Sequence, residues 1–292
     1  MIVVAGEALV DVIARRDGEI DAVPGGGPYN TARAIGRFGV PVAWAGVLSA
    51  DAHGRAMADA LASDGVSLDL VQRTSLPTTQ AFAELDERGE ARYRFVVDGT
   101  SAPSLDGARL LDSLSPVLDA VHVGTLGLVF EPMAGALGAL VASLDPGVLL
   151  MVDPNCRPSA ITDPAAYRAR MARILARADI VKLSTADQAY LGVEETAPVV
   201  VVTDAGGPVR VRVGEEALEV PVPAVEVVDT VGAGDTFGGA MLAWLAHAGV
   251  SRASAADPEV ILRAVRFGVR AASMVVQRPG ADPPTLADLG GW

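Results

Sequence analysis

The feature that most constrains the fold is a set of short, almost uninterrupted apolar runs separated by helical patterns. The apolar runs cover residues 148–152, 180–181 and 199–202. The helical patterns cover about 133–143, 164–177 and 185–191. Strands that are apolar on both faces are typical of parallel sheets covered by helices. The alternation therefore predicts an α/β fold with a doubly wound, mostly parallel central sheet flanked by helices.

Length and composition agree with a large buried core. The chain has 292 residues, of which 50% are hydrophobic and only 4% aromatic, so Ala, Val and Leu must fill the core. A chain of this length can form one large α/β domain or two smaller ones. Because it contains no linker, low-complexity tract or convincing repeat, we expect a single domain over residues 1–292.

A second β pattern differs from the buried runs. Residues 79–86 and 91–97 alternate polar and apolar side chains and are joined by the turn-like residues 87–90, which predicts an antiparallel hairpin. Residues 8–13 alternate in a similar way. We therefore expect a small β-sheet, formed from about 8–22 and 78–98, that projects as a lid over the site. Its exposed edge could pair with a second copy and form a homodimer.

Charge and cysteine content exclude several classes of partner and site. The net charge of −13 argues against nucleic acid and anionic membranes, but not against a nucleotide held by backbone donors and Mg²⁺. Cys156 is the single cysteine, which excludes an intramolecular disulfide and a cysteine zinc site. The longest apolar run is too short to span a bilayer, and a strand pattern begins within two residues of Met1. These features predict a cytoplasmic protein.

The most informative motif for function covers residues 227–237. An apolar strand leads into a Gly-rich turn that opens directly onto a helix. Unpaired N–H groups in such a turn attract anions, and Asp235 places a carboxylate beside them. That carboxylate could abstract a proton from an attacking hydroxyl, or it could simply cap the helix.

Two N-terminal segments are candidates for ligand binding. Asp11 shares a strand face with Leu9 and Ile13, where a carboxylate is costly unless it binds something, such as ligand hydroxyls. It could equally face solvent on an edge strand. The three glycines at 25–27 allow close approach to a ligand, and Asn30 offers a donor and an acceptor. A plain glycine turn at a helix start explains that segment equally well.

Polar residues follow the buried strands, at 153–157, 182–184 and 203–207. Ligands bind at the carboxyl ends of strands in open α/β sheets, so Arg157 and Lys182 could contact phosphate, although either could also be a surface charge. Gly-Lys-Ser/Thr is absent, which excludes a Walker A loop, and the turn at 232–234 lacks the third glycine of the dinucleotide fingerprint. A hydride-transfer enzyme is therefore disfavoured.

Together these residues resemble the carbohydrate kinases of the ribokinase-like (PfkB) family over the whole chain. One signature matches Gly25-Gly26-Gly27-Pro28-Tyr29-Asn30, and the other matches residues 229–237. The resemblance implies that Asp235 is the general base and that the backbone of Gly232, Ala233 and Gly234 forms an anion hole for the transferred group. It implies ATP as phosphoryl donor together with Mg²⁺ and a monovalent cation such as K⁺.

The resemblance also assigns the remaining site residues. The sugar would contact Asp11, Gly26, Gly27, Asn30, Phe95 and Arg157. The nucleotide would contact Lys182, Ser184, Thr203, Gly206 and Gly234. The monovalent cation would lie at Asp229 and Val231, and Mg²⁺ would be assisted by Asp187.

The chain departs from the family pattern at two places. Family members usually carry Asn-x-x-Glu where this chain has Ser184 and Asp187, and an aspartate reaches less far toward Mg²⁺ than a glutamate. They also tend to carry Thr-x-Gly-x-x-Gly, whereas the glycines in residues 203–208 are displaced.

The resemblance is strongest to fructokinases. It implies an ATP-dependent sugar kinase that transfers the γ-phosphoryl group to a primary hydroxyl of a small sugar, with fructose as the leading substrate. Three alternatives stay open: a 2-keto-3-deoxygluconate kinase, a nucleoside kinase of the same fold, and a catalytically inactive sugar-binding sensor.

Overall fold

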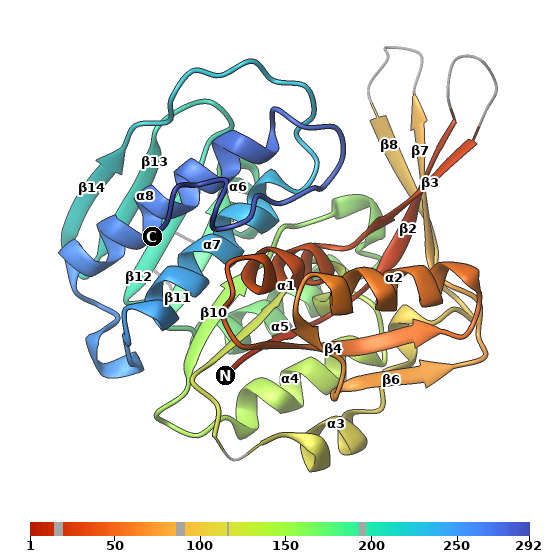
Figure 1. The fold of residues 1–292 in the computed structure, drawn as a ribbon. Coiled ribbons are helices and arrows are strands. Elements are labelled where there is room, and N and C mark those ends of the chain that lie inside the picture. The colour runs from red at the N-terminus through yellow and green to blue at the C-terminus, as the bar shows by residue number, and fades with distance from the viewer. Residues whose placement is uncertain (15–19, 86–90, 116, 193–196) are drawn as a thin grey trace.

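The computed structural model describes residues 1–14, 20–85, 91–115, 117–192 and 197–292. Its main body is built around a ten-stranded central sheet (Figure 1). The strands of this sheet are β1 (Ile2–Ala5), β4 (Val42–Ser49), β5 (Val66–Ser67), β6 (Val71–Thr74), β9 (Ala120–Gly124), β10 (Leu149–Asp153), β11 (Ile180–Ser184), β12 (Val199–Thr203), β13 (Val209–Val213) and β14 (Glu216–Val220).

The strand order is β14-β13-β12-β11-β10-β9-β1-β4-β5, with β6 also paired to β4. Neighbours from β12 to β5 are parallel, and β13 and β14 add an antiparallel edge. The chain builds the sheet outward from β1 to β4 and then returns to continue from β9 in the other direction. This reversal beside β1 is the point at which open α/β sheets bind ligands. The predicted doubly wound, mostly parallel sheet is confirmed.

Helices cover both faces of the central sheet. One buried core joins the sheet to α1 (Gly27–Arg37), α2 (Ala52–Ser63), α7 (Ala233–His247) and α8 (Pro258–Val275). The core on the other face includes α3 (Gly107–Ser113), α4 (Met133–Ser143) and α5 (Pro164–Leu175), and α6 (Thr185–Leu191) packs beside it. Short 3-10 turns are η1 (Ala102–Ser104), η2 (Thr125–Leu128), η3 (Pro158–Ala160) and η4 (Arg252–Ser254). Within the described ranges, the helices are too short or too polar to cross a membrane.

The predicted helices agree closely with α4, α5 and α6, but the predicted strand ends are too early. Residues 182–184 belong to β11 rather than to the loop after it, and Asp153 belongs to β10. Lys182 can continue a buried strand because its ammonium pairs with the buried Asp153 carboxylate at 2.9 Å. A polar residue with a partner is therefore compatible with the sheet interior.

A four-stranded sheet projects from the main body (Figure 1). This projecting sheet has the order β3 (Ile20–Gly25), β2 (Leu9–Ala14), β7 (Gln80–Leu85) and β8 (Ala91–Val96). The predicted antiparallel hairpin is present as β7 and β8, whereas β2 and β7 run parallel. The predicted turn at 87–90 and the lid residues 15–19 lie outside the described residues. Pairing of two copies through this sheet stays a prediction.

Candidate active site

A cavity of about 350 Å³ lies where the projecting sheet meets the carboxyl ends of β1, β9, β10 and β11. All six residues predicted to contact the sugar line it, together with three of the four residues predicted for catalysis and with Lys182 and Val231. These residues are Asp11, Gly26, Gly27, Asn30, Phe95, Arg157, Lys182, Val231, Gly232, Gly234 and Asp235. The fold thus gathers side chains from both ends of the chain around one space.

Other predicted residues lie outside the lining of this cavity. They are Asp187, Ser184, Thr203, Gly206, Asp229 and Ala233. Ser184 and Thr203 are paired neighbours at the ends of β11 and β12, and Gly206 is exposed in the loop that follows. Three of the proposed nucleotide contacts, Ser184, Thr203 and Gly206, therefore lie outside the cavity lining, at or just after the carboxyl ends of β11 and β12. The roles of all the proposed nucleotide contacts stay predictions.

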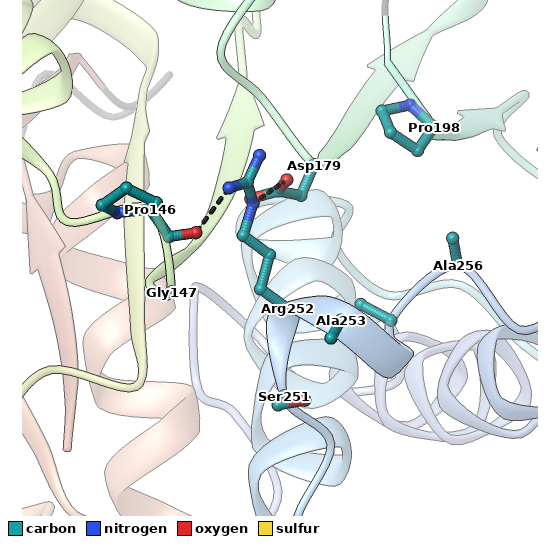
Figure 2. Close-up of a pocket in the computed structure, with 9 residues that line it drawn as sticks. Pro146, Gly147, Asp179, Pro198, Ser251, Arg252, Ala253 and Ala256 are labelled. Carbon is teal, nitrogen blue, oxygen red and sulfur yellow. Dashed lines mark hydrogen bonds and ion pairs between the residues drawn. The ribbon is translucent and has the colours of Figure 1, made fainter.

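A larger cavity, of about 440 Å³, lies at the amino ends of β10, β11 and β12, on the side of the sheet away from the first cavity, and different residues line it. Figure 2 shows Arg252 extending between Asp179 and the carbonyl of Pro146. The Asp179 carboxylate also accepts hydrogen bonds from the Leu150 amide and from Arg177. The charged side chains of this larger cavity therefore hold neighbouring segments together. The volume of a cavity alone does not identify the reactive site.

Asp235 lies in the first turn of α7, at the wall of the smaller cavity. Gly232 is the N-cap of α7 and has a φ of 75°, a left-handed conformation that favours glycine. Among the described residues no side chain caps this helix, so the capping role considered for Asp235 is not seen. Instead, its Oδ2 accepts a hydrogen bond of 2.9 Å from Asn30 Nδ2. The Ala233 amide donates to the Thr230 carbonyl at 3.2 Å.

The surroundings of Asp235 tune its basicity. Burial raises the pKa of Asp235 to about 6, while the hydrogen bond from Asn30 and the positive charges of Lys182 and Arg157 act to lower it. A carboxylate with this pKa is ionised at neutral pH and is a stronger base than an exposed aspartate. The position can therefore accept a proton from a hydroxyl in the cavity.

A positive charge lies directly against the turn of α7. A Cβ atom placed on Gly234 would come within 2.8 Å of Lys182 Nζ. Burial lowers the pKa of the Lys182 ammonium, but the carboxylates of Asp153, Asp235 and Asp187 together raise it by more, so the net pKa is above the ordinary value. The ammonium and the helix N-terminus thus form one electropositive wall, which suits an anionic group.

Asp11 and Arg157 line the same cavity. Asp11 lies on β2, an interior strand of the projecting sheet, so the edge-strand alternative is wrong. Burial raises the pKa of Asp11 to about 6, although the charge of Arg157 lowers it. Arg157 Nη1 is fixed by the Asn155 side chain at 2.6 Å and by the Asn155 carbonyl at 3.0 Å. A carboxylate and a guanidinium are the groups expected around a polyhydroxylated ligand.

The aromatic residues of the hairpin divide between two faces. Tyr93 and Phe95 stack at 6.2 Å between ring centroids, and both line the cavity. Phe82, on the partner strand β7, is absent from the described lining and lies under the Arg94 guanidinium instead. This difference follows from the strand alternation, which places the side chains of neighbouring positions on opposite faces.

Sequence reasoning missed Glu7 and Thr125, which also line the cavity. The Glu7 side chain is fully buried, and burial raises its pKa to about 8, against hydrogen bonds from its own amide, Gly127 and Gly27 that lower it. Thr125 directly follows β9, and Glu7 lies two residues after the end of β1. The signal that found Arg157 and Lys182, a polar residue after a buried strand, would have found them.

The predicted metal residues make protein contacts in the structure. Asp187 accepts hydrogen bonds from the Cys156 amide at 2.6 Å and from the Ser184 amide at 2.8 Å, and it forms a capping box with Ser184. Asp229 accepts from the amides of Val231 and Gly280. Over the described residues, no cluster of three or more His, Cys, Asp or Glu side chains could hold a metal ion.

Comparisons with known proteins agree with this geometry. The family model of the pfkB family carbohydrate kinases matches residues 1–288. A fructokinase of Rhizobium leguminosarum bv. trifolii is 34% identical over 261 residues, which cover 84% of this chain and 79% of the relative.

Two solved structures are similar over nearly the whole chain. A fructokinase with bound ATP from Xylella fastidiosa superposes with a TM-score of 0.89 at 28% identity, covering 99% of this chain and 96% of that one. A fructokinase double mutant from Vibrio cholerae O395, in its fructose, ADP and potassium ion bound form, gives 0.84 at 25% identity, with coverage of 99% and 96%. Motifs, fold and cavity thus lead to one conclusion: this chain belongs to the pfkB family of carbohydrate kinases.

Proposed function

We propose that the protein transfers the γ-phosphoryl group of ATP to a primary hydroxyl of fructose, with Asp235 as the general base. One observation carries this proposal. Asp235 is buried in the first turn of α7, hydrogen-bonded by Asn30, and faces the cavity beside the Lys182 ammonium. A base and an electropositive anion site therefore lie next to each other, as transfer between an alcohol and a phosphoryl group requires.

The reaction follows from this arrangement. The sugar hydroxyl gives its proton to an Asp235 oxygen while its own oxygen bonds to the γ-phosphorus. The bond between that phosphorus and the bridging oxygen breaks, and ADP leaves with the electron pair. Negative charge on the transferred group faces the amides of Gly232 and Gly234 and the Lys182 ammonium, which stabilise it.

Other residues of the cavity lining bind and orient the sugar. Asp11 and the Oδ1 atom of Asn30 accept hydrogen bonds from sugar hydroxyls, and the fixed Arg157 guanidinium contributes donors. Tyr93 and Phe95 cover the sugar from the projecting sheet. Because this sheet lies over the cavity, we infer that it acts as a lid that keeps water from the γ-phosphoryl group.

Two cations complete the proposal. Mg²⁺ would neutralise charge at the phosphates. Asp187, whose oxygens accept hydrogen bonds from the Cys156 and Ser184 amides, would assist it only through water. K⁺ would bind beside Asp229 and Val231. The Asp229 carboxylate accepts hydrogen bonds from the amides of Val231 and Gly280. The Vibrio cholerae relative, whose structure holds fructose, ADP and potassium ion, supports both the substrate and this cation.

The decisive experiment replaces the base alone. We expect Asp235→Asn to lower kcat for fructose by about 10²–10⁴-fold, the usual contribution of a general base. Circular dichroism and calorimetric titration with fructose check that the fold and the sugar site persist. Asp257→Asn is the matched control, because Asp257 also lies at a helix N-terminus, as the cap of α8, and asparagine caps equally well. Wild-type kcat in Asp235→Asn would remove the base assignment.

A substrate panel with Mg²⁺-ATP, with and without K⁺, tests the remaining parts. Preference for 2-keto-3-deoxygluconate or for a nucleoside over fructose would replace the proposed acceptor. ATP consumption with none of the panel would leave the sugar-binding sensor as the better description.

A further inference from the structure

Glu7 is a buried carboxylate that the proposed chemistry does not use. It follows β1 at the centre of the sheet, and its side chain is fully shielded from solvent although it borders the cavity. Its two oxygens have separate backbone partners. Oε1 accepts from the Gly27 amide at 3.1 Å, and Oε2 accepts from the Gly127 amide at 2.7 Å.

These two amides belong to different elements, each of which contributes residues to the cavity lining. Gly27 is the first residue of α1, which also carries Asn30, the hydrogen-bond donor to Asp235. Gly127 lies in η2, which also carries Thr125. Glu7 therefore connects α1 and η2 to the end of β1 from a single side chain.

The backbone around Glu7 is closely packed, so the segments that meet there have little room to shift. A Cβ atom on Gly26 would lie 2.7 Å from the Glu7 carbonyl oxygen, and one on Gly27 would lie 2.2 Å from Thr125 Oγ1. Both distances are far below van der Waals contact. The N-terminus of α1 also lacks a capping side chain of its own among the described residues, so Glu7 supplies an acceptor from another element.

We propose that Glu7 is a positioning residue, which fixes the start of α1 and the η2 turn so that Asn30 holds the base Asp235 in its reactive orientation. This inference rests on the proposed kinase function. A displacement of α1 moves Asn30 and, through it, the Asp235 carboxylate. A misplacement of about 1 Å in a reacting group can cost about 10²-fold in rate.

The test uses Glu7→Gln, which keeps the size of the side chain but offers one acceptor and one amide donor. That donor would face one of the two N–H groups, so one connection is lost. We expect kcat for fructose to fall by about 10²-fold, with the KM for ATP unchanged and the far-UV circular dichroism intact. If Glu7→Gln does not fold, Glu7→Asp, which keeps the carboxyl group but is one methylene shorter, takes its place.

Asp179→Asn is the matched control. Asp179 is also a buried carboxylate that accepts from a backbone amide, that of Leu150 at 2.8 Å, but it lies at the amino end of β11, on the side of the sheet away from the first cavity. A residue that only stabilises the fold changes the unfolding midpoint and leaves the kcat of folded molecules unchanged, and we expect this of Asp179→Asn.

A double-mutant cycle with Asn30→Ala separates positioning from a general structural effect. If Glu7 acts through Asn30, the double variant loses no more activity than the more damaged single variant, because the same connection is already broken. The inference would be overturned if the losses of kcat in the two single variants multiplied in the double variant. A folded Glu7→Gln enzyme with the wild-type kcat would also overturn it. Because wild-type turnover is measured first, either result leaves the proposed function standing, whereas an inactive wild type would remove that function itself.

Discussion

The ion pair between Lys182 and Asp153 allows a sharp prediction about stability. Lys182 Nζ lies 2.9 Å from Asp153 Oδ2, and the two side chains are only 5% and 4% exposed. The other Asp153 oxygen accepts no hydrogen bond from the described residues. Replacing Lys182 with Met keeps a long apolar stem but leaves Asp153 buried without its partner.

The magnitude follows from the cost of an unpaired buried charge. Removing one member of a buried ion pair typically destabilises a protein by about 3–5 kcal/mol. Each kcal/mol lowers the thermal midpoint of a chain of 150–250 residues by about 2–4 °C, and that of a longer chain by less. For these 292 residues we take about 2 °C per kcal/mol and expect a fall of roughly 6–10 °C for Lys182→Met at pH 7.

The loss depends on pH with a definite sign. Burial already raises the pKa of Asp153 above its ordinary value, and Lys182 counteracts this rise. Without Lys182 the pKa of Asp153 in the folded state rises further, so the folded protein binds a proton that the unfolded chain releases. Stability is then lost as pH increases between the unfolded and folded pKa values, by up to about 1.4 kcal/mol per pH unit.

The assay is unfolding by heat and by urea, followed by tryptophan fluorescence, at pH 5.5 and 7.5, for the wild type, Lys182→Met and the double variant Lys182→Met/Asp153→Leu. Replacing both members of a buried pair with apolar groups is often nearly neutral, so the double variant recovers most of the loss. A single variant as stable as the wild type at both pH values would refute the reasoning. So would a double variant that is no more stable than the single one.

Three further predictions concern the site. The kcat/KM for fructose rises with pH through about 6, because Asp235 must lose its proton to act as base and burial raises its pKa to that value; a profile that is flat from pH 5 to 8 in a stopped assay would contradict this. Gly27→Ala abolishes sugar binding in calorimetry, because its Cβ would come within 2.2 Å of Thr125 Oγ1. Gly138→Ala is the control: it lies at an open position of α4, so the variant gains about 0.5–1 kcal/mol in the free energy of unfolding by urea. The Cys156 thiol reacts with a chromogenic disulfide only after denaturation, because it is buried and burial raises its pKa to about 12; rapid labelling of the native protein would show that the site opens.

The sequence predicted the central sheet well, because its signals are local. An apolar run such as 199–202 and a helical period such as 133–143 each depend on neighbouring residues alone. The motif at 227–237 likewise contains the glycine turn and Asp235 within one segment. Features of this kind can be found without knowing which elements become neighbours.

The rest of the site depends on contacts between distant parts of the chain. The Glu7 carboxylate meets amides that lie 20 and 120 residues away, and Asn30 meets Asp235 across 205 residues. The role of Asp187 also depends on a distant contact, because its carboxylate accepts a hydrogen bond from the Cys156 amide, 31 residues away. No periodicity encodes such pairings, and the residue types alone leave several roles open.

The connections of the projecting sheet limit how it can be redesigned. Strand β2 begins two residues after Glu7, and β3 ends at Gly25, two residues before α1 begins. Both junctions are therefore built from residues that border the cavity. A chimaera that receives this sheet from a relative would be spliced inside the reaction centre, so changing acceptor preference by exchanging the whole module would also disturb the catalytic groups. Point changes at Tyr93 and Phe95, on the hairpin that is attached elsewhere, offer the safer route to a new acceptor.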